Sequence, residues 1–303
     1  MRRIEESLMS VEVSCNICGS KDYTVLFPAR VAQINQIVRC NACGLMYANP
    51  REVIDLDSIE LMEPDWLMNH LHRPWVRQRL EKERLQTKDY KDTRAFLQAH
   101  FPRAGNLVEV GSSFGFLSRF FMESGWTVTG VDPNRGSCCY AKSEFRLNVI
   151  PSPLGRCDIQ ANSADVVLMM HVIEHLVDPK ESLSCVYKML KPGGVLVLET
   201  PRYDTWMFKY LGKRERSLGC NGHLYFFTSA SLTELARQSG FKLIRLDDVG
   251  RSLTLDRILY NLGVILKNKT LAYGFSELSR LLRLHKFWIY INLRDMQRAY
   301  FKK

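Results

Sequence analysis

The sequence lacks long apolar runs, repeats and low-complexity segments. No stretch of the 303 residues reaches the roughly 18 to 20 uninterrupted apolar residues that a membrane-spanning helix requires. The basic residues at the start are followed by no apolar segment, so no signal peptide is recognised and we expect a cytoplasmic protein. With 46% hydrophobic and 24% charged residues, the composition is that of a globular chain long enough for about two domains.

Acidic residues are scarce in the last 53 residues, where eleven Lys and Arg face three Asp and Glu. This segment therefore carries +8 of the total charge of +10. Its apolar residues recur at helical spacing, which predicts a basic helical tail over 251–303. Such a tail fits peripheral contact with an anionic membrane, or helices that pack on the preceding domain with a solvated basic face. RNA binding is less favoured, because no aromatic or basic recognition motif is present.

Changes in pattern divide the rest of the chain into three segments. Residues 1–50 form short strands and turns, and 51–100 form a connector or lid of two helices separated at Pro74. From 101 to 250, short apolar runs alternate with helical patterns, which predicts a parallel α/β sheet. The expected strands are 106–111, 127–132, 165–170, 195–200 and 241–247, and the expected intervening helices include 114–124 and 179–190.

Two CxxC pairs near the N-terminus predict a metal site formed by Cys15, Cys18, Cys40 and Cys43. Each pair is followed by a glycine, which allows the tight turn that directs both sulfur atoms to one ion. Four thiolates leave no open coordination position, so we expect a structural zinc ribbon. Nucleic-acid or partner binding is the alternative role for the ribbon, but its insert between the pairs has no basic run.

A glycine turn follows the first strand of the α/β segment. It includes Gly111, Ser112, Ser113 and Gly115, and a helix begins directly after it. Glycine lets a ligand approach the backbone closely at a helix N-terminus. Asp132 ends the next strand, where a carboxylate suits a ribose diol. The dinucleotide fingerprint GxGxxG does not fit, because its second and third glycines would fall at Ser113 and Phe116.

This turn resembles the (D/E)xGxGxG motif of class I S-adenosylmethionine (SAM)-dependent methyltransferases. Residues 165–176 resemble the DVV…HVLEHL segment of the same family, and 190–196 resemble its LKPGG turn. The resemblance implies a Rossmann-like methyltransferase sheet and SAM as cofactor. It implies that Glu109 and the turn Gly111–Gly115 hold the methionine part of SAM, although Ser113 departs from the usual glycine. The ribose would bind Asp132, the adenine would lie beside Pro133, and His171 would lie where the chain passes the sulfonium and amino-acid tail.

His223 follows the expected strand 195–200 and lies in a GHLYFFT segment. This segment resembles the HxxxF(S/T) loop of ubiquinone-type O-methyltransferases and of zinc-containing deoxysugar C-methyltransferases. A histidine is well suited to accept a proton near neutral pH, so His223 is the candidate general base. The alternatives are a hydrogen bond to substrate or packing of the loop.

The sequence thus predicts a methyltransferase for a small molecule, with a sugar, glycan or lipid-linked acceptor suggested by analogy. A second hypothesis is an RNA or protein methyltransferase that grips the polymer with ribbon and tail, although no NPPY motif is present. A third is a non-catalytic SAM-fold scaffold, for which Ser113 is the sole support.

Overall fold

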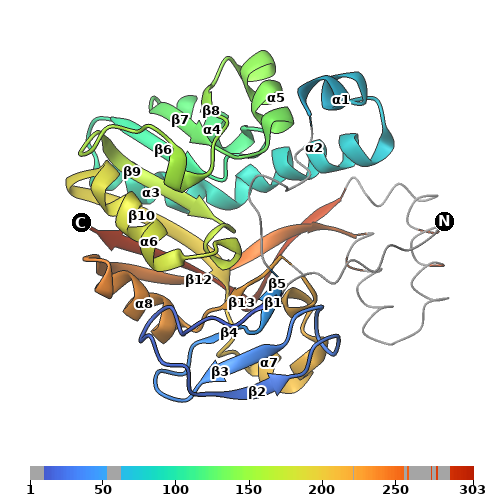
Figure 1. The fold of residues 1–303 in the computed structure, drawn as a ribbon. Helices are drawn as coiled ribbons and strands as arrows, with labels where there is room; N and C mark the ends of the chain where they lie inside the picture. The colour runs from blue at the N-terminus through green and yellow to red at the C-terminus, as the bar shows by residue number, and fades with distance from the viewer. Residues whose placement is uncertain are drawn as a thin grey trace.

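The computed structural model describes residues 10–52, 63–220, 222–255 and 287–303, together with single positions at 258, 274 and 278. Figure 1 shows a large sheet flanked by helices, with the N-terminal ribbon packed beside it. Within the described residues, no helix is long and apolar enough to cross a membrane.

The large sheet has seven strands in the order β12-β13-β10-β9-β6-β7-β8. Strands β6 to β10 are parallel, and β13 is antiparallel to both β10 and β12. The strands are β6 (Asn106–Val110), β7 (Thr127–Val131), β8 (Asn148–Ile150), β9 (Ala164–Met170), β10 (Leu190–Pro201), β12 (Lys242–Thr254) and β13 (Trp288–Lys302). The chain runs outward from β6 to β8 and then returns to β9 beside β6, so the topological switch point, where sheets of this kind bind ligands, lies at the carboxyl ends of β6 and β9. This is the expected Rossmann-like α/β sheet.

Helices cover both faces of the sheet, which explains the continuous apolar runs in its strands. Alternate residues of a strand face opposite sides: Val167 and Met169 join one core, and Val166 and Leu168 join the other. The first core includes α6 and α8, and the second includes α3 and α4. The helices that flank the sheet are α3 (Lys91–His100), α4 (Phe116–Met122), α5 (Arg135–Phe145), α6 (Pro179–Met189) and α8 (Ser229–Gln238).

The described part of the connector region forms three α-helices rather than two: a break precedes Pro74, and a 3-10 turn at Thr87–Tyr90 separates the second helix from α3. Helix α1 spans Pro64–Asn69 and α2 spans Pro74–Gln86. A proline at the first helical position costs no hydrogen bond, because that N–H has no partner within the helix, so Pro74 begins α2. In Figure 1, α2 lies in the same part of the molecule as α4 and α5.

The N-terminal segment forms an antiparallel sheet in the order β11-β4-β3-β2. Its strands are β2 (Tyr23–Phe27), β3 (Ile37–Cys40), β4 (Met46–Ala48) and β11 (Tyr225–Phe226). The last of these comes from the distant segment that follows His223. A separate pair joins β1 (Ser10–Val11) to β5 (Arg51–Glu52). Residues of the ribbon, including Cys15, Cys40 and Tyr47, belong to the same hydrophobic core as one face of the large sheet.

The helical prediction for 251–303 is wrong at both ends, because β12 continues to Thr254 and residues 288–302 form strand β13. This strand pairs with β10 on one side and β12 on the other, and it buries Met296, Ala299, Tyr300 and Phe301. Its apolar run was too short for its periodicity to separate strand from helix, and pairing on both edges favours the strand. Among the described positions of 255–286, Leu255, Ile258, Gly274 and Leu278 are helical. The rest of the predicted tail helices lies outside the described residues.

Candidate active site

The glycine turn lies at the carboxyl end of β6, over the end of β7. Gly111 and Ser112 donate backbone hydrogen bonds to Val131 O, at 2.8 and 3.2 Å. Gly111 has φ 76°, and a Cβ there would lie 2.4 Å from a methyl group of Val172. Glycine is therefore required by both backbone conformation and space. The side chain of Ser112 is buried and lies against Gly130. A ligand at the carboxyl ends of β6 and β9 would therefore meet the backbone of Ser112.

Asp132 ties the turn to the end of β7. Its Oδ2 accepts a 2.8 Å hydrogen bond from Ser113 N, and its Oδ1 accepts a 2.8 Å bond from Asn134 N. Burial raises the pKa of Asp132, although these two amides and Arg79 oppose the rise. Each carboxylate oxygen has two lone pairs, so acceptor capacity remains for a ribose diol. Pro133 follows Asp132 directly and is half-buried at the same edge.

Glu109 lies on β6 below the turn and is buried. Ser118 Oγ donates a 2.5 Å hydrogen bond to its carboxyl group. Burial raises the pKa of Glu109 to about 8; the Ser118 hydrogen bond opposes this, and the nearby carboxylates of Glu83 and Asp132 add to it. Arg79 pairs with Glu83 and opposes the pKa rise of Asp132, but one guanidinium does not balance three carboxyl groups, so a positively charged ligand is favoured at this position.

Glu83 on α2 is a site residue that the sequence analysis missed. Ser113 Oγ donates a 3.1 Å hydrogen bond to Glu83 Oε1, and burial raises the pKa of Glu83. Ser113 has φ 45°, a left-handed conformation that is uncommon for residues other than glycine. The serine in place of the usual glycine thus connects the turn to α2. No spacing signal marks Glu83, because α2 is dense in charged residues that resemble a solvated helix face.

His171 begins the loop after β9 and lies between two carboxylates. Its Nε2 is 3.1 Å from Glu199 Oε1, and its Nδ1 is 3.7 Å from Glu174 Oε1. Its side chain is 47% exposed; desolvation of the ring would lower its pKa, but these carboxylates raise the pKa to about 9, so His171 is an imidazolium at neutral pH. Glu199 on β10 also accepts a 2.6 Å hydrogen bond from Arg298 Nε on β13. Glu199 and Arg298 were not predicted, since the tail was expected to be helical.

His223 lies in the loop before β11 and packs edge-to-face on His175, with ring centroids 4.7 Å apart. Its side chain is buried, and its Nδ1 has no hydrogen-bond partner within the described part of the chain. Burial, reinforced by His175, lowers the pKa of His223 to about 4. The imidazole is therefore neutral at pH 7 and can accept a proton. Glu174, His175 and His223 each place a side-chain nitrogen or oxygen within 4.8 Å of the others.

The predicted residues thus converge on one edge of the sheet. Val172 contacts Gly111, and the same short loop carries His171, Glu174 and His175. Leu224 N donates to Glu174 O at 2.8 Å, which joins the His223 loop to this segment across a large sequence separation. The glycine turn, His171 and His223 are therefore neighbouring parts of a single region.

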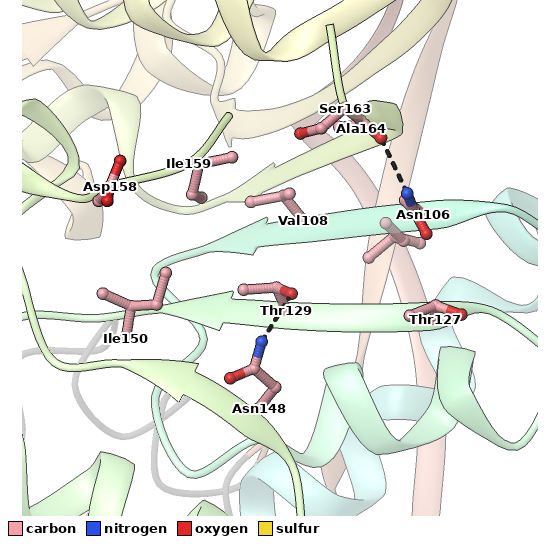
Figure 2. A pocket seen from close by; sticks show the side chains of 11 residues that line it. Asn106, Val108, Thr127, Thr129, Asn148, Ile150, Asp158, Ile159, Ser163 and Ala164 are labelled. Atoms are coloured by element: carbon pink, nitrogen blue, oxygen red, sulfur yellow. Dashed lines mark hydrogen bonds between the residues drawn. The ribbon is translucent and has the colours of Figure 1, made fainter. Parts of the chain in front are cut away.

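A cavity of about 330 Å³ lies elsewhere, on the face of β6, β7 and β8 beneath residues 158–164. Figure 2 shows that polar side chains line it, with Asn148 bonded to Thr129 and Asn106 bonded to the backbone of Ser163. The connection above it contains only a short 3-10 turn, Leu154–Arg156, in place of a longer helix. The glycine turn, Asp132, His171 and His223 do not line this cavity.

The four predicted cysteine ligands converge in the ribbon. Cys15 Sγ and Cys43 Sγ are 3.4 Å apart, Cys18 Sγ and Cys40 Sγ are 3.5 Å apart, and all four lie within 4.8 Å of one another. Bonds of about 2.3 Å to a tetrahedral zinc would place sulfur atoms roughly 3.8 Å apart. Gly19 and Gly44 have φ 74° and 77°, so both knuckles make the same turn. The arrangement fits one tetrahedral metal ion.

The family model described as "Methyltransferase domain" matches residues 81–246, which is more than half of the chain. The chain belongs to the class I SAM-dependent methyltransferase family. This match covers the glycine turn, Asp132, the His171 loop and His223, while the ribbon lies outside it.

Curated methyltransferases resemble the chain over this region. A probable SAM-dependent methyltransferase of Mycolicibacterium smegmatis is 27% identical over 48% of this chain and 55% of its own length. A ubiquinone biosynthesis O-methyltransferase of Caulobacter sp. is 34% identical over 34% of this chain and 46% of its own. The chain thus spans about half the length of these relatives.

A solved structure shares the fold of this methyltransferase family member. It is a methyltransferase in complex with the Trm112 methyltransferase activator of Haloferax volcanii, with 15% identity and a TM-score of 0.50. The match covers 81% of this chain and 99% of that one.

Proposed function

We propose that the protein transfers a methyl group from SAM to a small-molecule acceptor, with His223 as general base. The observation that carries this proposal is the buried, neutral His223, whose Nδ1 has no partner among the described residues, beside the loop that contacts the glycine turn. A general base must be unprotonated at working pH, and His223 meets that condition; its lowered pKa also makes the ring a weaker base than an ordinary imidazole.

The residues around the turn suit each part of SAM. Glu109, Gly111, Ser112, Ser113 and Gly115 would hold the methionine part, with the three neighbouring carboxyl groups facing its positive charges. Asp132 would bind the ribose, and Pro133 would lie beside the adenine. As an imidazolium, His171 suits the carboxylate of the methionine part.

Bound SAM would supply a methyl group attached to a sulfonium. The acceptor hydroxyl would lose its proton to a ring nitrogen of His223, and its oxygen would form the new bond to the methyl carbon. The carbon–sulfur bond would break, with its electron pair returning to sulfur. Because this is an in-line displacement, alignment of acceptor and methyl group by the site supplies much of the rate.

We also propose an acceptor class and partners for the enzyme. Ubiquinone biosynthesis O-methyltransferases among the relatives support an oxygen acceptor. By analogy with the sugar enzymes, we propose a sugar, glycan or lipid-linked hydroxyl compound. The ribbon would hold a structural Zn²⁺, and the cytoplasmic enzyme would contact anionic membrane through its basic tail.

The first test incubates the protein with methyl-labelled SAM and a host cell extract, and counts label in the lipid, glycan, RNA and protein fractions. We expect label in lipid or glycan, and its loss with Asp132→Ala. Label confined to RNA or protein would replace the proposal with a polymer methyltransferase, and absence of SAM binding would leave a scaffold.

The base is tested with His223→Asn against His100→Asn, since His100 is an exposed histidine at the end of α3. We expect His223→Asn to reduce transfer by roughly 10²–10⁴-fold with SAM affinity within twofold of wild type. Equal transfer by both variants would exclude His223 as base.

A further inference from the structure

The strand that follows His223 belongs to the ribbon sheet. Strand β11 has two residues, Tyr225 and Phe226, and it pairs with β4 through Tyr47 and Met46. Ala48 N of β4 also donates a 2.8 Å hydrogen bond to Leu224 O. The backbone of the proposed base loop is therefore part of the ladder that carries the second CxxC knuckle.

The insert between the two CxxC knuckles also forms a hydrogen bond to the backbone of His223. Gln33 lies in this insert, is 5% exposed, and donates from Nε2 to His223 O at 3.3 Å. Its Oε1 is buried and has no partner within the described residues. Burying this amide for one bond to a backbone carbonyl costs free energy, because its oxygen has lost its water partners.

Side chains of the ribbon and of the segment between β10 and β11 also share a small core. Ile37 and Met46 of the ribbon pack with Tyr203, Leu218 and Phe226. Figure 1 shows the ribbon strands beside α7 (Trp206–Leu211), in the segment that connects β10 to β11. The ribbon thus contacts the segment between β10 and β11, which carries the proposed base His223.

The glycine turn meets the His171 loop through the side chain of Val172, but its hydrogen bonds run elsewhere. Its hydrogen bonds run to Val131, Asp132 and Glu83, all within the methyltransferase sheet and α2. A small ribbon whose thiolates converge on one ion gains its folding energy from that ion. Loss of the metal should therefore loosen the base loop before it affects the turn.

We infer that the metal ribbon forms a wall of the acceptor site, in which Gln33 is a positioning residue for His223 and metal loading sets the geometry of transfer without contributing to SAM binding. The catalytic part of this inference rests on the proposed function. The mechanical part concerns only the coupling between the ribbon and residues 222–227.

The test compares three proteins by amide hydrogen exchange, SAM calorimetry and transfer of labelled methyl to the extract fraction that wild type labels. These are the metal-loaded wild type, the same protein after chelation with metal loss confirmed, and Gln33→Met. Methionine keeps the length of glutamine and removes the donor. The matched control is Gln36→Met, because Gln36 Nε2 donates at 2.9 Å to Asn49 O within the ribbon and makes no bond to the His223 loop.

We expect chelation and Gln33→Met to speed exchange at 222–227 at least tenfold and to lower transfer at least tenfold. Exchange at 107–115 and SAM affinity should stay within twofold of wild type, and Gln36→Met should match wild type. Unchanged exchange at 222–227 after metal loss, or parallel loss of SAM binding, would overturn the inference. If wild type transfers no methyl while the exchange coupling is present, the proposed function fails and the mechanical coupling stands.

Discussion

At the scale of single residues, the carboxyl groups of Glu83, Glu109 and Asp132 determine the charge beside the glycine turn. Burial raises the pKa of all three, and the charges of Glu83 and Asp132 reinforce the rise at Glu109. SAM carries a positive sulfonium and ammonium near this position in the proposed complex. A cation favours the ionised form of a neighbouring carboxyl group, so binding should release a proton from Glu109.

Affinity for SAM should accordingly rise with pH. Free Glu109 has a pKa of about 8, so most molecules must lose a proton when SAM binds at pH 7, and few must do so at pH 9. We expect about tenfold tighter binding at pH 9 than at pH 7, corresponding to roughly 1.4 kcal/mol. Calorimetry at pH 7 in buffers of different ionisation enthalpy should show proton release. Glu109→Gln is the control; the same proton release in that variant would assign the proton to another group.

At the scale of elements, β13 supplies the cation that supports the His171 loop. Arg298 is buried and donates to Glu199 and to Thr93 Oγ1. Burial alone would raise the pKa of Glu199, but Arg298 and then His171 lower it to about 2. Glu199 is thus a buried carboxylate that requires its partners.

Arg298→Met should leave that carboxylate without its main partner and destabilise the protein by about 3–5 kcal/mol. Urea unfolding monitored by far-UV circular dichroism measures the change. The control on the same strand is Arg294→Met. The Arg294 side chain is 74% exposed, and its ion pair with Asp248 is long, at 4.0 Å from Nε to Oδ2. Equal destabilisation by both variants would show that the buried pair does not determine the effect.

The same strand shows how far the sequence could be used for prediction. Periodicity and glycine spacing predicted the parallel strands β6, β7, β9 and β10 and the glycine turn after β6, because these features are local. Strand β8 was missed because it has three residues, and β13 because its state depends on pairing with β10 and β12. Glu83, Glu199 and Arg298 reach the site from other elements, so no local pattern in the sequence identifies them.

At the scale of the whole molecule, the excess positive charge of residues 251–303 is only partly available to a partner. Arg298 is buried against Glu199, Arg251 pairs with Asp295, and Lys303 bonds to Leu190 O. The basic residues between 256 and 286 lie outside the described residues. If the tail contacts an anionic bilayer, these remaining charges are the ones to test.

Truncation at residue 250 cannot test membrane contact, because it would remove β13 from between β10 and β12. The alternative is the double charge reversal Lys267→Glu with Lys269→Glu, compared with Lys21→Glu and Lys91→Glu at exposed positions of the ribbon and α3. Both pairs change the net charge equally.

We expect wild type to co-sediment with phosphatidylserine-containing vesicles but not with phosphatidylcholine vesicles, and binding to weaken between 0.05 and about 0.5 M salt as screening increases. The tail variant should lose most of this binding and the control pair little of it. Equal losses would show that net charge alone drives association, and would remove the tail from the proposal.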